Sequence, residues 1–393
     1  MRAKHCVVPL ALAVSAALAS AQNVAKPPVT GWEFVGLPAL NFSSDEGFGY
    51  GLLLEAYNYG SGVQPYRFTI QPGFLLTTKG RRDFTLFFDA PRLLPQNWRL
   101  DAIVASEGHL ATPYYGIGNT TQYNEQNEAP PNAYFYRYGR RRFRIASNLQ
   151  RKIGASPARF LIGAGWTSVR TDATPFDSGT TLFATDFGTT PRRGQDSFVR
   201  AGLIWDSRDR EVGPRRGAWS DLLVQRVDDA IGATNDYTRV TATTRHYFSV
   251  SDRLVFAQRL LAQQVDGAVP IYDLATVQTS FKQQEGLGGS NTVRGLPKNR
   301  FVGEGLVVSN SELRWRAAEF DVLRKPLYLV LSGFVDAGRV WAGTIGFSDI
   351  ASEFHAGYGG GLRVGVGPSF VAALDVGRSS EATQIYIGLG YPF

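Results

Sequence analysis

Charged residues with a distinctive spacing occur in two glycine-containing segments, 293–296 (Val-Arg-Gly-Leu) and 334–338 (Phe-Val-Asp-Ala-Gly). The chemistry that these residue types can perform is an ion pair. Asp336 lies in an apolar stretch and needs a cation to offset its desolvation, and Arg294 is the candidate. The glycines of 286–296 let the backbone turn sharply into a confined space, although a flexible surface loop has the same composition. The residues that we assign to this site are Val293, Arg294, Gly295, Phe334, Asp336 and Gly338, together with Glu312.

Covalent catalysis has little support in the sequence. After the first 21 residues the histidines are His109, His246 and His355, which are far apart, whereas a hydrolase needs a histidine beside a nucleophile and a carboxylate. The sequence has no Gly-x-Ser-x-Gly elbow, no His-Glu-x-x-His motif and no Cys/His metal spacing. The glycine run 357–361 resembles a phosphate loop, but no helix is expected after it. We expect no enzyme activity, no metal and no cofactor.

The first residues predict export. A short basic start precedes an apolar run, and 19–21 (Ala-Ser-Ala) has the small-x-small pattern of a signal-peptide cleavage site. We therefore expect a signal peptide over 1–21, an extended periplasmic linker over 22–31 and a single domain over 32–393. Cleavage would remove the only cysteine and the only methionine, so disulfides cannot stabilise the exported chain.

The charge balance is mildly basic, with 41 lysines and arginines against 34 acidic residues and a formal net charge of +7. The excess is spread along the chain and forms no concentrated patch, which argues against nucleic acid as a partner. It fits contact with outer-membrane lipid or a charged channel interior. No apolar run after the first 21 residues approaches the ~20 residues that a membrane helix needs.

Alternation of apolar and polar residues predicts sixteen β-strands. Phe84, Leu86 and Phe88 share one face of a strand while Thr85 and Asp89 share the other, which is the period of two that strands have. The predicted strands span 33–42, 47–59, 64–76, 81–91, 97–107, 133–150, 156–171, 195–207, 217–227, 235–249, 253–265, 303–316, 327–339, 356–366, 369–377 and 382–392.

The connections between these strands alternate in length. If the first strand rises from the periplasm, the long connections 108–132, 172–194, 266–302 and 340–355 all lie on the outer side, and the periplasmic turns are mostly short. A β-sandwich has no reason to show this asymmetry, which is typical of outer-membrane barrels. We predict an all-β fold, a transmembrane antiparallel β-barrel of sixteen strands that is integral to the bacterial outer membrane.

The alternation also predicts which side chains face lipid. Trp315 should contact lipid, while Glu312 and Arg314 should face the lumen. The same pattern places Tyr391 and Phe393 toward lipid in the last strand. A terminal strand that ends in Phe393 suits recognition by the barrel-assembly machinery, which can add to an exposed strand edge by pairing.

The sequence resembles the BamA/TamA superfamily of outer-membrane barrels, the bacterial surface antigen type, which includes two-partner secretion transporters. The family's Val-Arg-Gly-aromatic element on the sixth outer loop matches 293–296, and its Phe-x-Asp-x-Gly element on the thirteenth strand matches 334–338. The resemblance implies that Arg294 folds back into the barrel and pairs with Asp336. Leu296 departs from the family's aromatic residue, which implies weaker packing of the loop tip. Further matches lie at 115–119, 206–209 and 310–314.

The resemblance implies a gated barrel that assists insertion or export of other proteins without covalent chemistry. Characterised transport members carry periplasmic domains before the barrel, and 22–31 is too short for one. We therefore expect either a separate periplasmic client-binding protein as partner or a barrel with a different role. A passive outer-membrane pore is the main alternative, and an outer-membrane hydrolase is a remote one.

The family mechanism requires a weak seam between the first and last strands. The residues that would weaken strand pairing there are Pro38 in the first strand and Gly388 and Gly390 in the last. Any barrel that tapers where it closes would have similar residues, so both interpretations stay open at this point.

Overall fold

The computed structural model places most of the predicted domain. The predicted signal peptide, 1–21, lies outside the described residues, and so does the predicted linker up to residue 29. The described residues are 30–43, 47–63, 65–92, 98–130, 132–175, 179–280, 284–322, 325–343, 350, 352–366 and 370–393.

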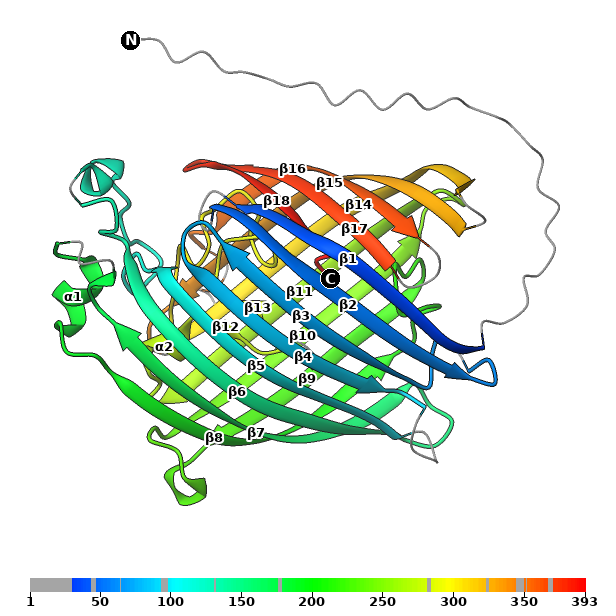
Figure 1. Ribbon diagram of the computed structural model, residues 1–393, viewed down its shortest axis with the longest axis horizontal. Helices are drawn as coiled ribbons and strands as arrows, with labels where there is room; N and C mark the ends of the chain where they lie inside the picture. The colour runs from blue at the N-terminus through cyan, green and yellow to red at the C-terminus, as the bar shows by residue number, and fades with distance from the viewer. Residues whose placement is uncertain are drawn as a thin grey trace, which may run out of the picture.

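A single antiparallel sheet of sixteen strands forms the barrel, which confirms the predicted number and pairing direction. Consecutive strands pair in sequence order, except that β11 pairs with β14 across a long connection. Figure 1 shows the strands tilted around the molecule. Their bounds are β1 (Gly31–Ser43), β2 (Gly47–Gly60), β3 (Phe68–Thr77), β4 (Arg81–Ala90), β5 (Trp98–Pro113), β6 (Arg137–Lys152), β7 (Ala158–Asp172), β8 (Arg193–Asp206), β9 (Gly217–Val227), β10 (Tyr237–Ser249), β11 (Leu254–Gly267), β14 (Gly305–Val322), β15 (Lys325–Trp341), β16 (His355–Val366), β17 (Phe370–Ser379) and β18 (Thr383–Leu389).

Short elements occupy the long connections. Figure 1 shows α1 at the end of the barrel where these connections gather, which is the outer end in the predicted topology. Among the described residues, no helix is both long enough and apolar enough to cross a membrane. The elements are α1 (Leu182–Phe187), α2 (Ile271–Leu274), the two short helical turns η1 (Glu125–Glu128) and η3 (Asp229–Ile231), and the hairpin of β12 (Thr276–Val277) and β13 (Gln284–Glu285).

The strand faces alternate as predicted along β14. Leu313 is 49% exposed and Trp315 is 48% exposed on the outer surface of the barrel, whereas Glu312 is fully buried and Arg314 nearly so. Apolar side chains on the outer surface of this fold are in contact with lipid, and the polar ones fill the lumen. The register of β14 is therefore the predicted one.

The end of the chain departs from the predicted alternation. β18 ends at Leu389, and Gly390 adopts a left-handed backbone (φ +77) that only glycine takes easily. The chain then turns into the lumen, where the Tyr391 and Phe393 rings lie 4.3 and 5.2 Å from the Arg314 guanidinium carbon. The prediction that Tyr391 and Phe393 face lipid is wrong, because the turn at Gly390 breaks the period of two.

The first and last strands lie close to each other. Cα atoms of β1 and β18 come within 8 Å of one another. Within the described residues, however, the ladder of paired residues runs only from β1 through the intervening strands to β18. β1 has 13 residues and β18 has 7, so at least part of the β1 edge has no β18 residue opposite it.

The connection between β11 and β14 fills much of the lumen. Its α2, β12 and β13 segments pack inside the barrel, and an apolar cluster joins the connection to the inner faces of three strands. The cluster comprises Leu261, Val277, Leu287, Val293, Leu296, Phe301, Leu306, Val308 and Val340. This core, and not the strand ladder alone, positions the candidate site.

Candidate functional site

The candidate site lies where the tip of this connection, the lumen loop (268–304), meets β14–β17. Arg294 at the tip is only 1% exposed. Glycines make the close approach possible: a Cβ added to Gly357 on β16 would lie 1.9 Å from the Arg294 carbonyl oxygen. Gly295 has φ +102, and a Cβ there would lie 2.5 Å from the Arg378 backbone. The loop backbone therefore lies directly on the barrel wall.

Arg294 and Asp336 form a bidentate ion pair. The Arg294 Nε and Nη2 atoms donate to the two Asp336 carboxylate oxygens at 2.7 and 3.0 Å, and the Arg294 backbone N–H donates to Oδ2 at 3.1 Å. Asp336 is fully buried. The pair joins the loop tip to β15, the thirteenth barrel strand, and a parallel two-bond geometry of this kind fixes orientation as well as position.

Two further carboxylates share the cations at the site. Arg294 Nη1 donates to Glu312 at 3.0 Å and lies 3.4 Å from Asp375. Arg363 donates two bonds to Asp375, at 2.7 and 2.9 Å, and Arg314 Nε donates to Glu312 at 3.0 Å. Together with Asp336, three carboxylates face three guanidinium groups, so the buried charges compensate one another.

An aromatic ring completes the contacts of the arginine. The Arg294 guanidinium carbon lies 3.4 Å from the centre of the Phe334 ring. A cation over an aromatic face is stabilised by the ring quadrupole, the more so when both groups are dehydrated. Gly338 plays a packing role, since a Cβ there would lie 2.4 Å from Leu287 and 3.3 Å from Val293 of the lumen loop.

The loop tip is buried in the apolar cluster of the lumen. Val293 is fully buried and Leu296 is 1% exposed, and both belong to that cluster. The expectation that Leu296 packs less firmly than an aromatic residue would stays a prediction. The cluster accommodates an aliphatic side chain at the position where the family has an aromatic one.

Several residues of the site were not predicted from sequence. Asn310 donates from Nδ2 to Asp336 at 2.8 Å, and the Tyr386 hydroxyl accepts the Gly295 N–H at 3.1 Å. Asp375 and Arg363 are the other additions. The argument that identified Asp336, a charged residue in an otherwise apolar strand, applies equally to Asp375 and could have found it. Asn310 lay in the family match at 310–314 but was not assigned to the site, and Tyr386 carried no signal.

The predicted seam residues lie apart from the ion pairs, but one residue links the two regions. Pro38 pairs with Leu52 inside β1–β2, and Gly388 pairs with Ala373 inside β17–β18. Phe393 lies in the lumen near Arg314. Tyr386 on β18 holds the lumen-loop tip through Gly295, so the last strand and the loop are directly connected.

The three histidines of the described residues do not form a common site. His109 on β5 lies 2.8 Å from Asp83 on β4 through Nε2. His246 on β10 lies 2.8 Å from Thr244, and the His355 ring at the start of β16 stacks on Phe301 at 3.7 Å. Each of the three contacts its own neighbours, away from the Arg294–Asp336 pair.

Comparison with known proteins supports the family resemblance. The model of the Omp85 superfamily domain matches residues 70–391. No curated protein matches the chain in sequence. The chain is similar in structure to BamA from Haemophilus ducreyi lacking POTRA domains 1–3, with a TM-score of 0.56, 13% identity and coverage of 92% of this chain and 71% of that one.

Two further solved structures have the same fold. CdiB from Escherichia coli matches with a TM-score of 0.57 and 11% identity, over 93% of this chain and 64% of that one. CdiB from Acinetobacter baumannii matches with a TM-score of 0.52 and 14% identity, over 92% of this chain and 60% of that one. The chain thus spans less than two thirds of the length of either CdiB protein. The family match over most of its length shows that this chain belongs to the Omp85 superfamily and is an integral β-barrel of the outer membrane.

Proposed function

We propose that this barrel assists the insertion or export of other proteins at the outer membrane, and that the seam between β1 and β18 is where it acts. Membership of the Omp85 superfamily and the resemblance to assembly and secretion barrels support a role in protein insertion or transport. The role of the seam is the more specific part of the proposal and rests on the geometry of this chain.

The observation that carries the proposal is the mismatch between the terminal strands. The 13 residues of β1 lie beside a β18 of only 7 residues, with no register of paired residues between them within the described chain. Unpaired backbone groups at a strand edge are a template for an incoming strand. A client segment that pairs with this edge would gain main-chain hydrogen bonds whatever its side chains are.

The ion pairs at the loop tip give the proposal a second element. They hold the lumen loop against β14–β17, and this occupied lumen is unlike that of an open passive pore. Tyr386 transmits the position of the loop to β18. In this proposal the Arg294–Asp336 pair, with Val293, Gly295 and Gly338 packed around it, keeps the loop fixed while the seam opens.

A disulfide across the seam tests this role. Because the predicted mature chain has no cysteine, single cysteines can be introduced along 33–41 and 383–389 and the spontaneously oxidised pairs selected. The native host would carry the locked variant in place of its own gene. Quantitative proteomics of the outer-membrane and secreted fractions would then be compared under oxidising and reducing conditions.

The expected result is a set of outer-membrane or secreted proteins that falls when the seam is locked and recovers on reduction. The matched control is a disulfide between positions 242 and 262, which are opposed within the paired strands β10 and β11. If deletion of the gene leaves both proteomes unchanged, the protein-handling role is wrong. A large steady conductance in planar bilayers would favour the passive pore.

A further inference from the structure

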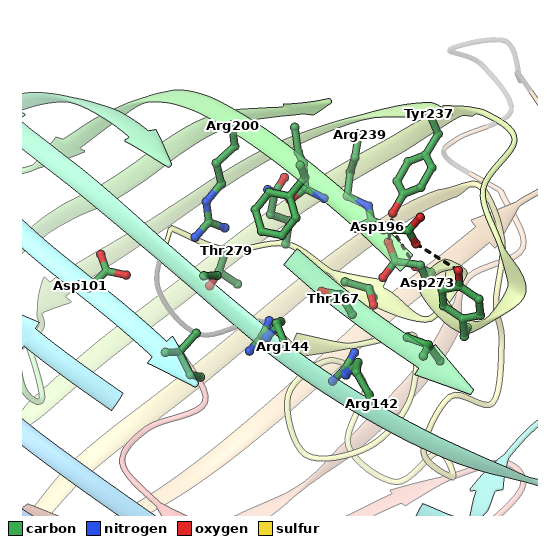
Figure 2. A pocket seen from close by; sticks show the side chains of 18 residues that line it. Asp101, Arg142, Arg144, Thr167, Asp196, Arg200, Tyr237, Arg239, Asp273 and Thr279 are labelled. Atoms are coloured by element: carbon green, nitrogen blue, oxygen red, sulfur yellow. Dashed lines mark hydrogen bonds and ion pairs between the residues drawn. The ribbon is translucent and has the colours of Figure 1, made fainter. Parts of the chain in front are cut away.

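Arginines on the lumen side of the barrel have carboxylates close to them. Figure 2 shows one such group of charges around a small cavity of about 40 Å³ on the inner wall. In this group Arg239 pairs with Asp273 at 2.9 Å, and Arg142 pairs with the nearby Glu107 at 2.6 Å. The arginines on the membrane-facing surface are arranged differently.

Four arginines form a row across the outer surface of β4–β8. In the sheet register Arg82 on β4 lies opposite Gly108 on β5, and Gly108 lies opposite Arg141 on β6. Arg141 lies opposite Arg170 on β7, which in turn lies opposite Arg193 on β8. All four arginines are exposed. These four residues are called the arginine row below.

The alternation along each strand shows that the row points away from the lumen. On β6, Arg141 shares a face with Phe143 and Ile145, which are 39% and 47% exposed on the outer surface of the barrel. The neighbours Arg140 and Arg142 are buried in the lumen. The other three strands alternate in the same way, so the whole row lies on the side of the barrel that the membrane surrounds.

The height of the row in the membrane follows from β6. Arg141 and Arg151 are both exposed on the outer face of this strand, ten residues apart. With a rise of about 3.4 Å per residue and a tilt of about 40°, this separation is about 26 Å along the membrane normal, close to the ~25 Å of the apolar belt. Arg141 therefore lies at one boundary of the belt, the outer one in the predicted topology, and Arg151 lies at the other.

Aromatic side chains on the membrane side of the row give the same height. Phe84 and Phe143 are the next outward residues on β4 and β6, and the Phe143 ring lies 6.2 Å from that of Trp166 on β7 in an edge contact. Aromatic girdles mark the level at which hydrocarbon meets the headgroups. The row lies one outward position beyond this girdle, in the headgroup layer of the outer leaflet.

Within the described part of the chain, the side chains of the row make no ion pair or hydrogen bond. Asp172, two residues beyond Arg170 on β7, is exposed and accepts the Thr174 N–H at 3.2 Å. One such carboxylate would leave three of the four positive charges unbalanced. Like charges directly opposite each other on neighbouring strands destabilise a sheet, and Arg170 faces a like charge on both sides. An anion from outside the chain would relieve this repulsion.

We propose that the arginine row binds the phosphate groups of the phosphorylated glycolipid of the outer leaflet, lipopolysaccharide. A guanidinium group can hold a phosphate through two parallel hydrogen bonds. Strands about 4.8 Å apart bring several such groups to one headgroup, and Gly108 has no side chain to separate Arg82 from Arg141. The acyl chains of the lipid would then lie on the aromatic girdle and the apolar surface below it.

This surface lies on β4–β8, away from the β1–β18 seam, and is independent of the proposed protein-handling role. Calorimetric titration of the detergent-solubilised barrel with bisphosphorylated lipid A, the membrane anchor of lipopolysaccharide, tests it at fixed ionic strength with EDTA present. The wild type should bind lipid A saturably. Arg141→Gln/Arg170→Gln should weaken binding by about tenfold or more, the scale for losing charge-assisted hydrogen bonds. Arg151→Gln is the matched control, an exposed arginine on the same strand at the opposite leaflet.

Two comparison probes identify the group that is recognised. Dephosphorylated lipid A and phosphatidylglycerol should bind the wild type about as weakly as lipid A binds the double variant. Heat-modifiable mobility in gels checks that each variant is folded. Saturable binding of lipid A that weakens in the double variant but not in Arg151→Gln supports the row. Absence of saturable binding, equal binding by the double variant, an equal loss in Arg151→Gln, or equally tight binding of either comparison probe overturns it.

Discussion

The lumen-loop network and the β1–β18 seam are two neighbouring regions of one barrel that follow opposite principles. At the network, every charged group has a geometrically defined partner, and Arg294 alone donates to three carboxylates. At the seam, a 13-residue strand lies beside a 7-residue strand without a described register. Among the described residues, fixed polar contacts therefore concentrate where the loop meets β14–β17.

A fully closed strand ladder has no edges, and an edge that stays open must be covered or tolerated. In the proposed function the seam is such an edge, and the polar network secures the lumen loop to the thirteenth strand, so the loop stays in place when the seam opens. Variants in the two regions should therefore have effects of different size.

The largest effect should come from breaking the central ion pair. Arg294→Ala leaves Asp336 buried without its bidentate partner, and Asp336→Ala leaves Arg294 with fewer acceptors. Each should lower the free energy of unfolding by about 3–5 kcal/mol, the scale for breaking one member of a buried pair. Urea unfolding in lipid vesicles, followed by tryptophan fluorescence, would measure it.

The double variant Arg294→Ala/Asp336→Ala should lower the free energy of unfolding by clearly less than the sum of the two single changes. Both members of the pair are removed together, so neither stays buried without the other. Arg226→Ala is the control: this arginine bridges Asp228 and Asp236 on an exposed loop, and exposed pairs contribute about 1 kcal/mol or less. Additive effects in the cycle would mean that the pair is not an energetic unit.

Gly357→Ala should have the second-largest effect on the network. The added Cβ would lie 1.9 Å from the Arg294 carbonyl oxygen, so the loop tip must move and the ion pairs must lengthen. We expect a loss of about 1–3 kcal/mol, the usual cost of overpacking, together with faster proteolysis of the lumen loop. Gly360→Ala on the same strand is the control, since its nearest atom would be 3.4 Å away. Equal stability of the two variants would contradict the close approach.

Near the seam, Phe393→Ala should have a smaller effect. The ring lies 5.3 Å from the Arg259 guanidinium carbon and 5.2 Å from that of Arg314, and such contacts contribute about 0.5–1 kcal/mol each. Phe393→Leu separates the lost ring from lost apolar volume. A loss as large as that of Arg294→Ala would place Phe393 in the structural core and weaken the contrast between the two regions.

The smallest effect on stability should come from Asp209, in the turn between β8 and β9 that contacts the inward end of the chain. Burial would raise the pKa of Asp209, but the backbone N–H groups of Arg215 and Arg216 and the nearby Arg210 outweigh it and hold the pKa below its usual value. Because the pKa is lowered in the folded state, the carboxylate stabilises the folded protein above the unfolded pKa of about 4. This stabilisation is lost as the pH falls through the folded-state pKa. Since the group is largely exposed, we expect less than about 1 kcal/mol.

Asp209→Asn should therefore reduce the melting temperature slightly at pH 7 and leave it unchanged near pH 2–3, in a thermal-unfolding series across pH. The same small change at every pH would show that the carboxylate charge has no role in this turn.

Most of the fold could be predicted because one physical rule governs every strand. The alternation of lipid-facing and lumen-facing side chains has a period of two, so strands such as β9 and β10 were placed to within about two residues. The rule failed at the end of the chain, where a single backbone angle at Gly390 ended the alternation. The φ angle that a glycine adopts depends on its surroundings. Here these include Arg259, Arg314 and Arg363, which come from other strands and contact the rings of Tyr391 and Phe393.

The sequence by itself determined the fold class, the strand order and the lumen face of Glu312 and Asp336. These follow from local periodicity and from the cost of an uncompensated charge in an apolar setting, and both are readable along the chain. The same charge argument made Arg294 the candidate partner of Asp336, and the family resemblance implied their pairing. Only the tertiary structure decided the sharing of three carboxylates among three arginines, the link from Tyr386 to the loop tip, and the hydrogen bonds that join Asp101 on β5 through Asn148 on β6 to Arg200 on β8. Each of these joins residues from strands far apart in sequence, and the shear of the closed sheet, not local composition, sets which side chains meet in the lumen.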